Sequence, residues 1–87
     1  MTPNAYADCL ASSLAVSGGQ IDGLSSGRTP CQTAERVVAA EIANLAAGLG
    51  TGGGPTRVDG WTCLSYDGNE VTCTRGHATV YAQFSLS

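Results

Sequence analysis

The sequence predicts an α+β domain in which one helix packs on a three- to four-stranded antiparallel β-meander, cross-linked by two disulfides. Two patterns predict this fold: an apolar stripe at helical spacing in the middle of the chain, and alternating side chains around two tight turns in its last third. The third observation is the presence of four cysteines in 87 residues. A chain this short buries a small core and commonly depends on cross-links, so we expect a single domain over residues 1–87.

The helix is expected over residues 30–48. Thr29-Pro-Cys-Gln32 has the form of a capping box with proline at the first helical position, and Gly48 and Gly50 supply a stop. Apolar residues recur between them at spacings of three and four and form one narrow stripe. The stripe consists of Cys31, Ala34, Val38, Ile42, Leu45 and Leu49.

The last third of the chain, residues 61–86, predicts the meander. A first turn at 67–69 places Cys63 opposite Cys73, and a second turn at 75–76 places Cys73 opposite Ala78. Because strand side chains alternate, both registers put the same residues on the face toward the helix. That inner set is Trp61, Cys63, Val71, Cys73, Ala78, Val80, Ala82 and Phe84. The outer set is Thr62, Leu64, Tyr66, Thr72, Thr74, His77, Thr79 and Tyr81.

The remaining segments carry weaker signals. Residues 1–8 are expected to be loose, 18–29 to form a loop rich in glycine and serine, and 49–60 to form a Gly-rich connector. Leu14–Val16 is a candidate fourth strand before two glycines. The connector lacks the pattern of a phosphate-binding loop.

The charge of the chain excludes several function classes. Its formal net charge is −3, and its four basic residues are scattered arginines. Nucleic-acid binding and binding to an anionic membrane both require clustered cations, so neither is expected. No apolar run is long enough to span a membrane, and no cofactor pattern is present. We expect a monomer without cofactor or metal.

The cysteines indicate an oxidising compartment, because a short chain with four cysteines and no CxxC motif is typical of secreted disulfide frameworks. The first residues do not form a signal peptide, so Met1 is expected to be an expression start placed after a removed export segment. Four cysteines allow three pairings. The register favours Cys63–Cys73, which leaves Cys9–Cys31. The rival scheme joins Cys31 to one of the two strand cysteines and stays open, because loop-closure entropy does not separate the two.

The polar candidates for chemistry have simpler explanations. His77, the one histidine, is expected in an exposed turn, with no acid and serine placed beside it for general-base catalysis. A zinc site on Cys73 and His77 would require both side chains on one face, whereas the register turns them to opposite faces. Asp67 and Glu70 flank a turn and suit solvation better than glycoside hydrolysis. We therefore expect no catalytic residues and no enzyme.

The outer sheet face is the strongest candidate for recognition. An antiparallel sheet can leave one face in water, and threonine suits that position. Tyrosines there can form an interaction patch. The candidate interaction face is Tyr66, Tyr81, Leu64 and His77. Trp61, in contrast, points to the predicted core.

Three clusters carry a family resemblance: Thr29-x-Cys31-x-Thr33-Ala34-x-x-Val37, Gly60-Trp61-x-Cys63, and Val71-Thr-Cys-Thr-Arg-Gly76. With Cys9 upstream, they resemble small secreted or lipoprotein-borne cysteine domains of mycobacteria and related actinobacteria, over about residues 9–82. The resemblance implies an exported domain, secreted or associated with the cell envelope, and brings no catalytic residues. We therefore expect a non-catalytic binding module whose partner is a protein or envelope component. The alternative is a secreted protease-type enzyme inhibitor that presents the 48–60 loop.

Overall fold

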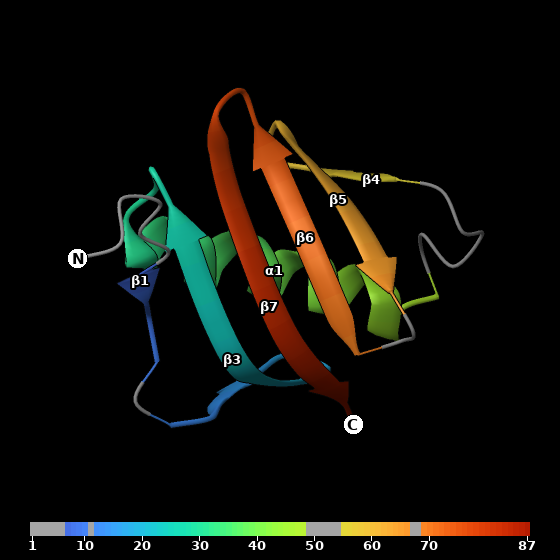
Figure 1. The fold of residues 1–87 in the computed structure, drawn as a ribbon. Helices are drawn as coiled ribbons and strands as arrows, with labels where there is room; N and C mark the ends of the chain where they lie inside the picture. Colours follow the sequence, from blue (N-terminus) through green and yellow to red (C-terminus); the bar gives the residue numbers. More distant parts are fainter. Residues whose placement is uncertain (1–6, 11, 49–54, 67–68) are drawn as a thin grey trace.

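The computed structural model describes residues 7–10, 12–48, 55–66 and 69–87, with Ala7 and Tyr66 described by their backbone alone. Within these ranges one helix packs on a sheet of seven antiparallel strands, in the order β1-β3-β7-β6-β5-β4, with β2 also pairing with β3 (Figure 1). The elements are β1 (Ala7–Asp8), β2 (Leu14–Val16), β3 (Gly19–Gly27), α1 (Cys31–Ala46), β4 (Thr56–Val58), β5 (Trp61–Tyr66), β6 (Glu70–Arg75) and β7 (Ala78–Leu86). The α+β class is confirmed, but the sheet is larger than the three or four strands expected.

The core lies between α1 and one face of the sheet, and the helix crosses the strands on that side (Figure 1). Every residue assigned to the inner face of the meander is buried except Ala78, which is partly buried against the core. The helix contributes Ala34, Val37, Val38 and Ile42 to this core. Because the helix covers one face, the other face of the sheet has no covering layer among the described residues.

Residues 18–29, expected to be a loop, instead contain β3, which pairs with β7 along its whole length. Glycine and serine have low strand propensity, but pairing with a neighbouring strand overrides that local preference. A register shift between Ile21 and Gly23 marks a bulge at Asp22. The bulge sets the buried Ile21 and Leu24 three residues apart, which hides the two-residue alternation of a strand.

The second hairpin differs from the expected register by two residues. Cys73 pairs with Val80 and Arg75 with Ala78, whereas Cys73 was expected opposite Ala78. The turn is therefore 76–77, and Gly76 occupies its first central position with φ of 60°, as a type II′ turn requires. Since strand side chains alternate with a period of two, a shift of two residues leaves the inner and outer sets unchanged. The first hairpin has the expected register, with Cys63 opposite Cys73.

The helix begins without the expected capping box. Pro30 is the N-cap residue and has no side-chain oxygen to accept a bond from the N–H groups of the first turn, while Thr29 Oγ1 donates to the carbonyl of Gly27 at 3.3 Å. At the other end Gly48 adopts φ of 83° and its N–H donates to the carbonyl of Leu45, which is the expected glycine stop.

Two further segments are more ordered than expected. The predicted connector 49–60 contains β4, which pairs with β5 through the turn Asp59-Gly60. Both turn residues have positive φ, 50° and 85°, as in a type I′ hairpin. At the N-terminus, Ala7–Asp8 forms β1 rather than a loose segment. Residues 1–6 and 49–54 lie outside the described residues. The candidate strand at 14–16 is present as β2.

Candidate functional site

The outer face of the sheet brings together side chains from four neighbouring strands. Leu64 pairs with Thr72, Thr72 with Tyr81, and Tyr81 with Ser25, so the four residues lie in one row across β5, β6, β7 and β3. A second row, one step nearer the β6–β7 turn, consists of Thr62, Thr74 and Thr79. Neighbouring strands lie about 4.8 Å apart, so each row is a line of closely spaced side chains.

A shallow depression of about 350 Å³ lies on this face and is lined by Ser25, Thr72, Thr79 and Tyr81. In the part of the chain that the structure describes, the hydroxyls of Thr72, Thr79 and Tyr81 make no hydrogen bond to another protein group. Ser25 Oγ donates to Asp8 Oδ1 at 3.5 Å, at the rim of the depression. These hydroxyls are therefore available to a ligand.

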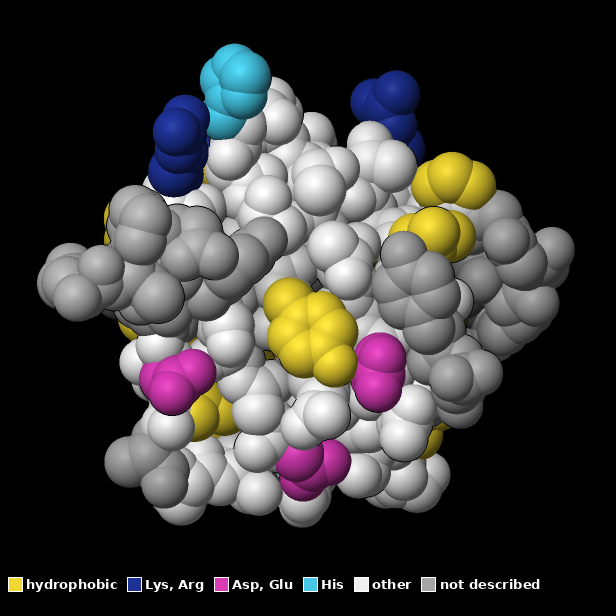
Figure 2. All heavy atoms as spheres, in the orientation of Figure 1, with side chains coloured by type: hydrophobic (Ala, Val, Ile, Leu, Met, Phe, Trp, Pro, Cys, Tyr) yellow, Lys and Arg dark blue, Asp and Glu magenta, His cyan; other side chains and the backbone are white. Residues whose placement is uncertain are grey.

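Charged side chains lie on this face (Figure 2), but none of the described residues that line the depression is charged. Basic side chains and the histidine lie at one end of the face, and acidic side chains lie toward the other end. His77 belongs to the first end, at the β6–β7 turn, and Glu70 to the opposite end of β6. The middle of the face combines hydrophobic and uncharged polar atoms.

The predicted interaction residues are distributed unevenly over this face. Tyr81 lines the depression, and Leu64 is half-buried in the same row. His77 is exposed in the β6–β7 turn and lines neither of the two depressions described here. The backbone of Tyr66 pairs with Glu70, but its side chain lies outside the described residues. Asp67 also lies outside them.

A second depression lies where β3 and β7 meet at the C-terminal end of the chain. Its lining consists of Gly19, Gln20, Ser85, Leu86 and Ser87. Leu86 is 45 % exposed there, but it is a single apolar side chain among backbone and polar atoms. We assign no site to it.

Trp61 is a core residue, as expected, with 1 % of its surface exposed. The guanidinium carbon of Arg75 lies 4.8 Å from the centre of its ring, a cation–π geometry. Arg75 is exposed, so its side chain covers the tryptophan on the solvent side. Trp61 therefore offers no aromatic platform to a ligand.

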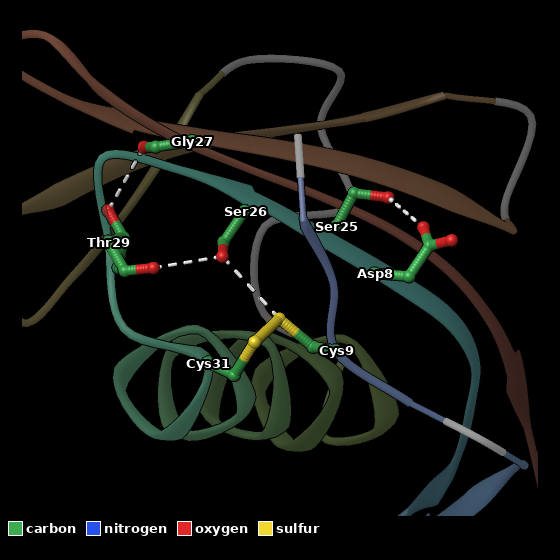
Figure 3. Close-up of a disulfide and its surroundings, with 7 residues drawn as sticks. All are labelled: Asp8, Cys9, Ser25, Ser26, Gly27, Thr29 and Cys31. Atoms are coloured by element: carbon green, nitrogen blue, oxygen red, sulfur yellow. Dashed lines mark hydrogen bonds between the residues drawn. A yellow bond between two sulfur atoms is a disulfide. The ribbon is translucent and has the colours of Figure 1, made fainter. Parts of the chain in front are cut away.

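The two disulfides join Cys9 to Cys31 and Cys63 to Cys73, the pairing that the register favoured. Cys63 and Cys73 are directly opposed on β5 and β6, with Cα atoms 4.0 Å apart, and both are fully buried. The other bridge joins the segment after β1 to the start of α1 (Figure 3). Beside it Ser26 Oγ lies 3.4 Å from the Cys9 sulfur and donates to the carbonyl of Thr29 at 2.9 Å.

A buried carboxyl group is the feature that the sequence interpretation missed. Glu41, on the sheet-facing side of α1, is completely buried. Its Oε2 accepts a hydrogen bond from Ser65 Oγ at 3.4 Å, and its Oε1 has no partner. Burial raises the pKa of this carboxyl above its ordinary value, and the hydrogen bond from Ser65 only partly opposes that shift. Its position three residues after Val38, at the spacing of the apolar stripe, was the sequence signal that could have predicted this burial.

A second acidic residue, Asp22 at the β3 bulge, is exposed and fully hydrogen-bonded. It accepts bonds from Ser85 Oγ at 2.6 Å, from the Gln20 amide, and from Ser13 Oγ at 3.3 Å. The bonds from Ser85 and Gln20 lower the pKa of Asp22. The group joins β7 to β3 and to the segment before β2, which is a structural role.

Among the described residues, no group of three or more His, Cys, Asp or Glu side chains is arranged to hold a metal ion. In the same residues no helix is long and apolar enough to cross a membrane. Comparisons with protein-family models, curated proteins and solved structures gave no match.

Proposed function

We propose that the protein is an exported, non-catalytic binding module of the actinobacterial cell envelope, which engages its partner through the outer sheet face around Tyr81. One observation carries this proposal. The sheet face left bare by α1 holds a depression whose aromatic ring and three hydroxyl side chains come from three different strands. Export is supported by the two disulfides, and the envelope by the resemblance of the cysteine clusters.

Rigidity supports a binding role for this face. Three of the four lining residues stand on adjacent paired strands directly above the buried disulfide between β5 and β6 and the core. Threonine is β-branched and has little rotamer freedom to lose. Side chains held in this way bind with a smaller entropy cost than side chains on a flexible loop.

The absence of a catalytic role is supported by where the reactive groups stand. Glu41 and Ser65 are hydrogen-bonded to each other, but Glu41 is completely buried between helix and sheet. His77 is exposed at the far end of β6 and β7 from Ser65, which pairs with Val71. A general base needs to reach its nucleophile within hydrogen-bond distance, so these three groups do not form a catalytic set.

The inhibitor alternative receives less support. An inhibitory loop over 48–60 would have to present its backbone to a protease, whereas residues 56–58 form β4 and pair with β5. Residues 49–54 lie outside the described residues. The outer sheet face is therefore the better-supported recognition surface.

The proposal is tested by capture from a mycobacterial envelope extract with immobilised protein. Wild type is compared with Tyr81→Ala and with Arg36→Ala, a matched control on the exposed side of α1. We expect at least one envelope component to be retained by wild type and Arg36→Ala and lost with Tyr81→Ala. Circular dichroism and thermal unfolding establish that each variant is folded.

Two results would count against the proposal. Recovery of the same components by wild type and Tyr81→Ala would show that the outer face is not the binding surface. Loss of binding with Arg36→Ala alone would place the surface on the helix side of the molecule.

A further inference from the structure

The chemistry of the depression on the outer face narrows the class of ligand. Among the described residues, its lining offers the aromatic ring of Tyr81 and the hydroxyls of Ser25, Thr72, Thr79 and Tyr81 itself. None of these four side chains is charged. An anion or a cation bound there would lose hydration without gaining a counter-charge, which is costly.

A purely apolar ligand is also a poor match. It would remove water from the hydroxyls of Thr72, Thr79 and Tyr81, which have no protein partner within the described residues. A polar group that loses its water and finds no new partner costs about 1–3 kcal/mol. The ligand must therefore bring several hydrogen-bonding groups of its own and also an apolar surface for the tyrosine ring.

From this combination we infer that the depression binds a ring of a neutral oligosaccharide. A sugar ring presents C–H groups on its face, which pack on an aromatic ring, and hydroxyls around its edge, which exchange hydrogen bonds with serine, threonine and tyrosine. Ser25, Tyr81 and Thr72 of the site also belong to the row of side chains that runs across the strands to Leu64. A linear glycan can follow that row from the depression toward Leu64. Because the ligand occupies the face assigned above, this inference rests on the proposed function.

The charges around the face favour a neutral glycan over an acidic one. Asp8 is hydrogen-bonded to Ser25 at the rim, and the protein carries a net charge of −3. Acidic side chains lie on the half of the face that includes Glu70 (Figure 2). A uronic acid or a phosphorylated sugar would be repelled by these groups.

Chemical-shift mapping on ¹⁵N-labelled protein tests the inference with defined probes. The neutral probes are hexamers of glucose, mannose, galactose and N-acetylglucosamine. The charged probes are hexamers of glucosamine and of galacturonic acid, which match two of them in length and ring. We expect at least one neutral hexamer to shift the amides of Ser25, Thr72, Thr79 and Tyr81 saturably, with a Kd of about 1 mM for a shallow site.

Substitutions separate the contribution of the tyrosine ring from that of the threonine hydroxyls. Tyr81→Ala is expected to weaken the responding hexamer at least tenfold, while Tyr81→Phe keeps the ring and most of the affinity. The double variant Thr72→Val/Thr79→Val keeps the shape of the face and removes two hydroxyls, so it is also expected to bind at least tenfold more weakly. Arg36→Ala, on the helix, is expected to bind as wild type does.

The inference is overturned if no neutral hexamer shifts these amides, if Tyr81→Ala binds as well as wild type, or if a charged hexamer binds more tightly than its neutral counterpart. Failure of all the neutral hexamers leaves the proposed function testable on its own. In that case a difference between wild type and Tyr81→Ala in envelope capture would still support a binding face, with a partner other than a neutral glycan.

Discussion

Glu41 Oε2 accepts a hydrogen bond of 3.4 Å from Ser65 Oγ, and within the described residues this bond is the one polar contact of a completely buried carboxyl group. The bond joins the core side of α1 to the inner face of β5. A charged carboxylate at this position would keep one oxygen unpaired and out of water. The stability of the fold is therefore expected to depend on pH through Glu41.

The pH dependence has a definite sign. Burial raises the pKa of Glu41 in the folded protein above the ordinary value of 4.5, so the folded state holds this proton more tightly than the unfolded chain does. The contribution of Glu41 to stability is complete below that ordinary pKa and is lost as the pH rises through the raised one. Urea unfolding at successive pH values should show a falling free energy of unfolding above pH 4.5.

Substitutions at this pair check the assignment. Glu41→Gln should remove the fall of the free energy of unfolding with rising pH. Glu41→Met should raise the free energy of unfolding at pH 8 by about 1–3 kcal/mol, because no unpaired oxygen is then buried. Ser65→Ala removes the bond that lowers the pKa of Glu41 in the folded protein, so the fall in the free energy of unfolding should extend to higher pH. Glu35→Gln, on the same helix, controls for the loss of one negative charge. An unchanged pH profile in Glu41→Gln would contradict the assignment.

Gly19 and Gly23 of β3 should differ sharply in their tolerance of alanine. A Cβ atom at Gly19 would lie 2.2 Å from the carbonyl oxygen of Ser85, a backbone atom that cannot move without disturbing β7. At Gly23 the nearest contact would be 3.4 Å, to the flexible side chain of Gln83. We expect Gly19→Ala to cost about 1–3 kcal/mol, as overpacking does, and Gly23→Ala to change stability by less than about 1 kcal/mol.

Thermal and urea unfolding of the two variants measure this difference directly. Both substitutions add one methyl group to the same strand, so strand propensity cancels between them. Equal stabilities would show that β3 and β7 do not approach as closely at Gly19 as the structure has it.

The inner face of the meander could be predicted because it depends only on alternation and on whether a register error is odd or even. Trp61 and Cys63 share a face by alternation, the correctly placed first turn adds Cys73 to it, and the misplaced second turn shifted the pairing by an even number of residues. The error in the β6–β7 register therefore did not change which residues were assigned to the inner and outer faces. The core and the bare outer face followed correctly from a pairing that was wrong in detail.

β3 could not be predicted in the same way, because its stability comes from pairing rather than from its own residues. Its sequence is rich in glycine and serine, and the bulge at Asp22 breaks the alternation between Ile21 and Leu24. Ser25, which lines the depression, was missed with it. The Asp59-Gly60 pair is typical of a type I′ turn and could have predicted the hairpin that contains β4. The many glycines around it indicated a connector instead.

Glu41 was missed for a different reason. Its spacing from Val38 and Leu45 fits the apolar stripe of the helix, but charged residues are rarely buried without a partner, so the predicted stripe did not include Glu41. The site on the outer face shows the same limit. Tyr81 and Thr72 were assigned to the right face, but their grouping into one depression depends on the register, which only the structure supplied.

The two disulfides should contribute differently to stability. Loop-closure entropy gives each about 3 kcal/mol, and slightly more to Cys9–Cys31, because its loop spans 22 residues rather than 10. The difference in burial predicts the opposite order for the contributions of the two disulfides to stability. Cys63 and Cys73 are fully buried in the core, so replacing both by alanine also removes packed sulfur atoms and leaves a cavity, whereas Cys9 and Cys31 are only half-buried.

We therefore expect Cys63→Ala/Cys73→Ala to unfold at a lower urea concentration than Cys9→Ala/Cys31→Ala. Equilibrium urea unfolding of both double variants measures the order, and far-ultraviolet circular dichroism shows whether each starts folded. The opposite order would mean that the bridge at the start of α1 holds the fold together more than the buried one does.

Arg75 should stabilise the fold through the ring of Trp61. The guanidinium lies 4.8 Å from the ring centre and covers it on the solvent side, and a cation–π contact at an exposed position contributes about 0.5–1 kcal/mol. Arg75→Ala should lower the free energy of unfolding by that amount. It should also shift the native fluorescence emission to longer wavelength, because water reaches the ring. Trp61 is the one tryptophan in the chain, so the emission reports this site alone.

Two further variants separate charge from coverage at this contact. Arg75→Lys keeps the positive charge and most of the aliphatic stem, so its emission should stay closer to wild type than that of Arg75→Ala. Arg36→Ala removes one positive charge from the helix, away from Trp61, and should leave the emission unchanged. If Arg75→Ala keeps both the emission and the stability of wild type, the arginine does not cover the ring in solution.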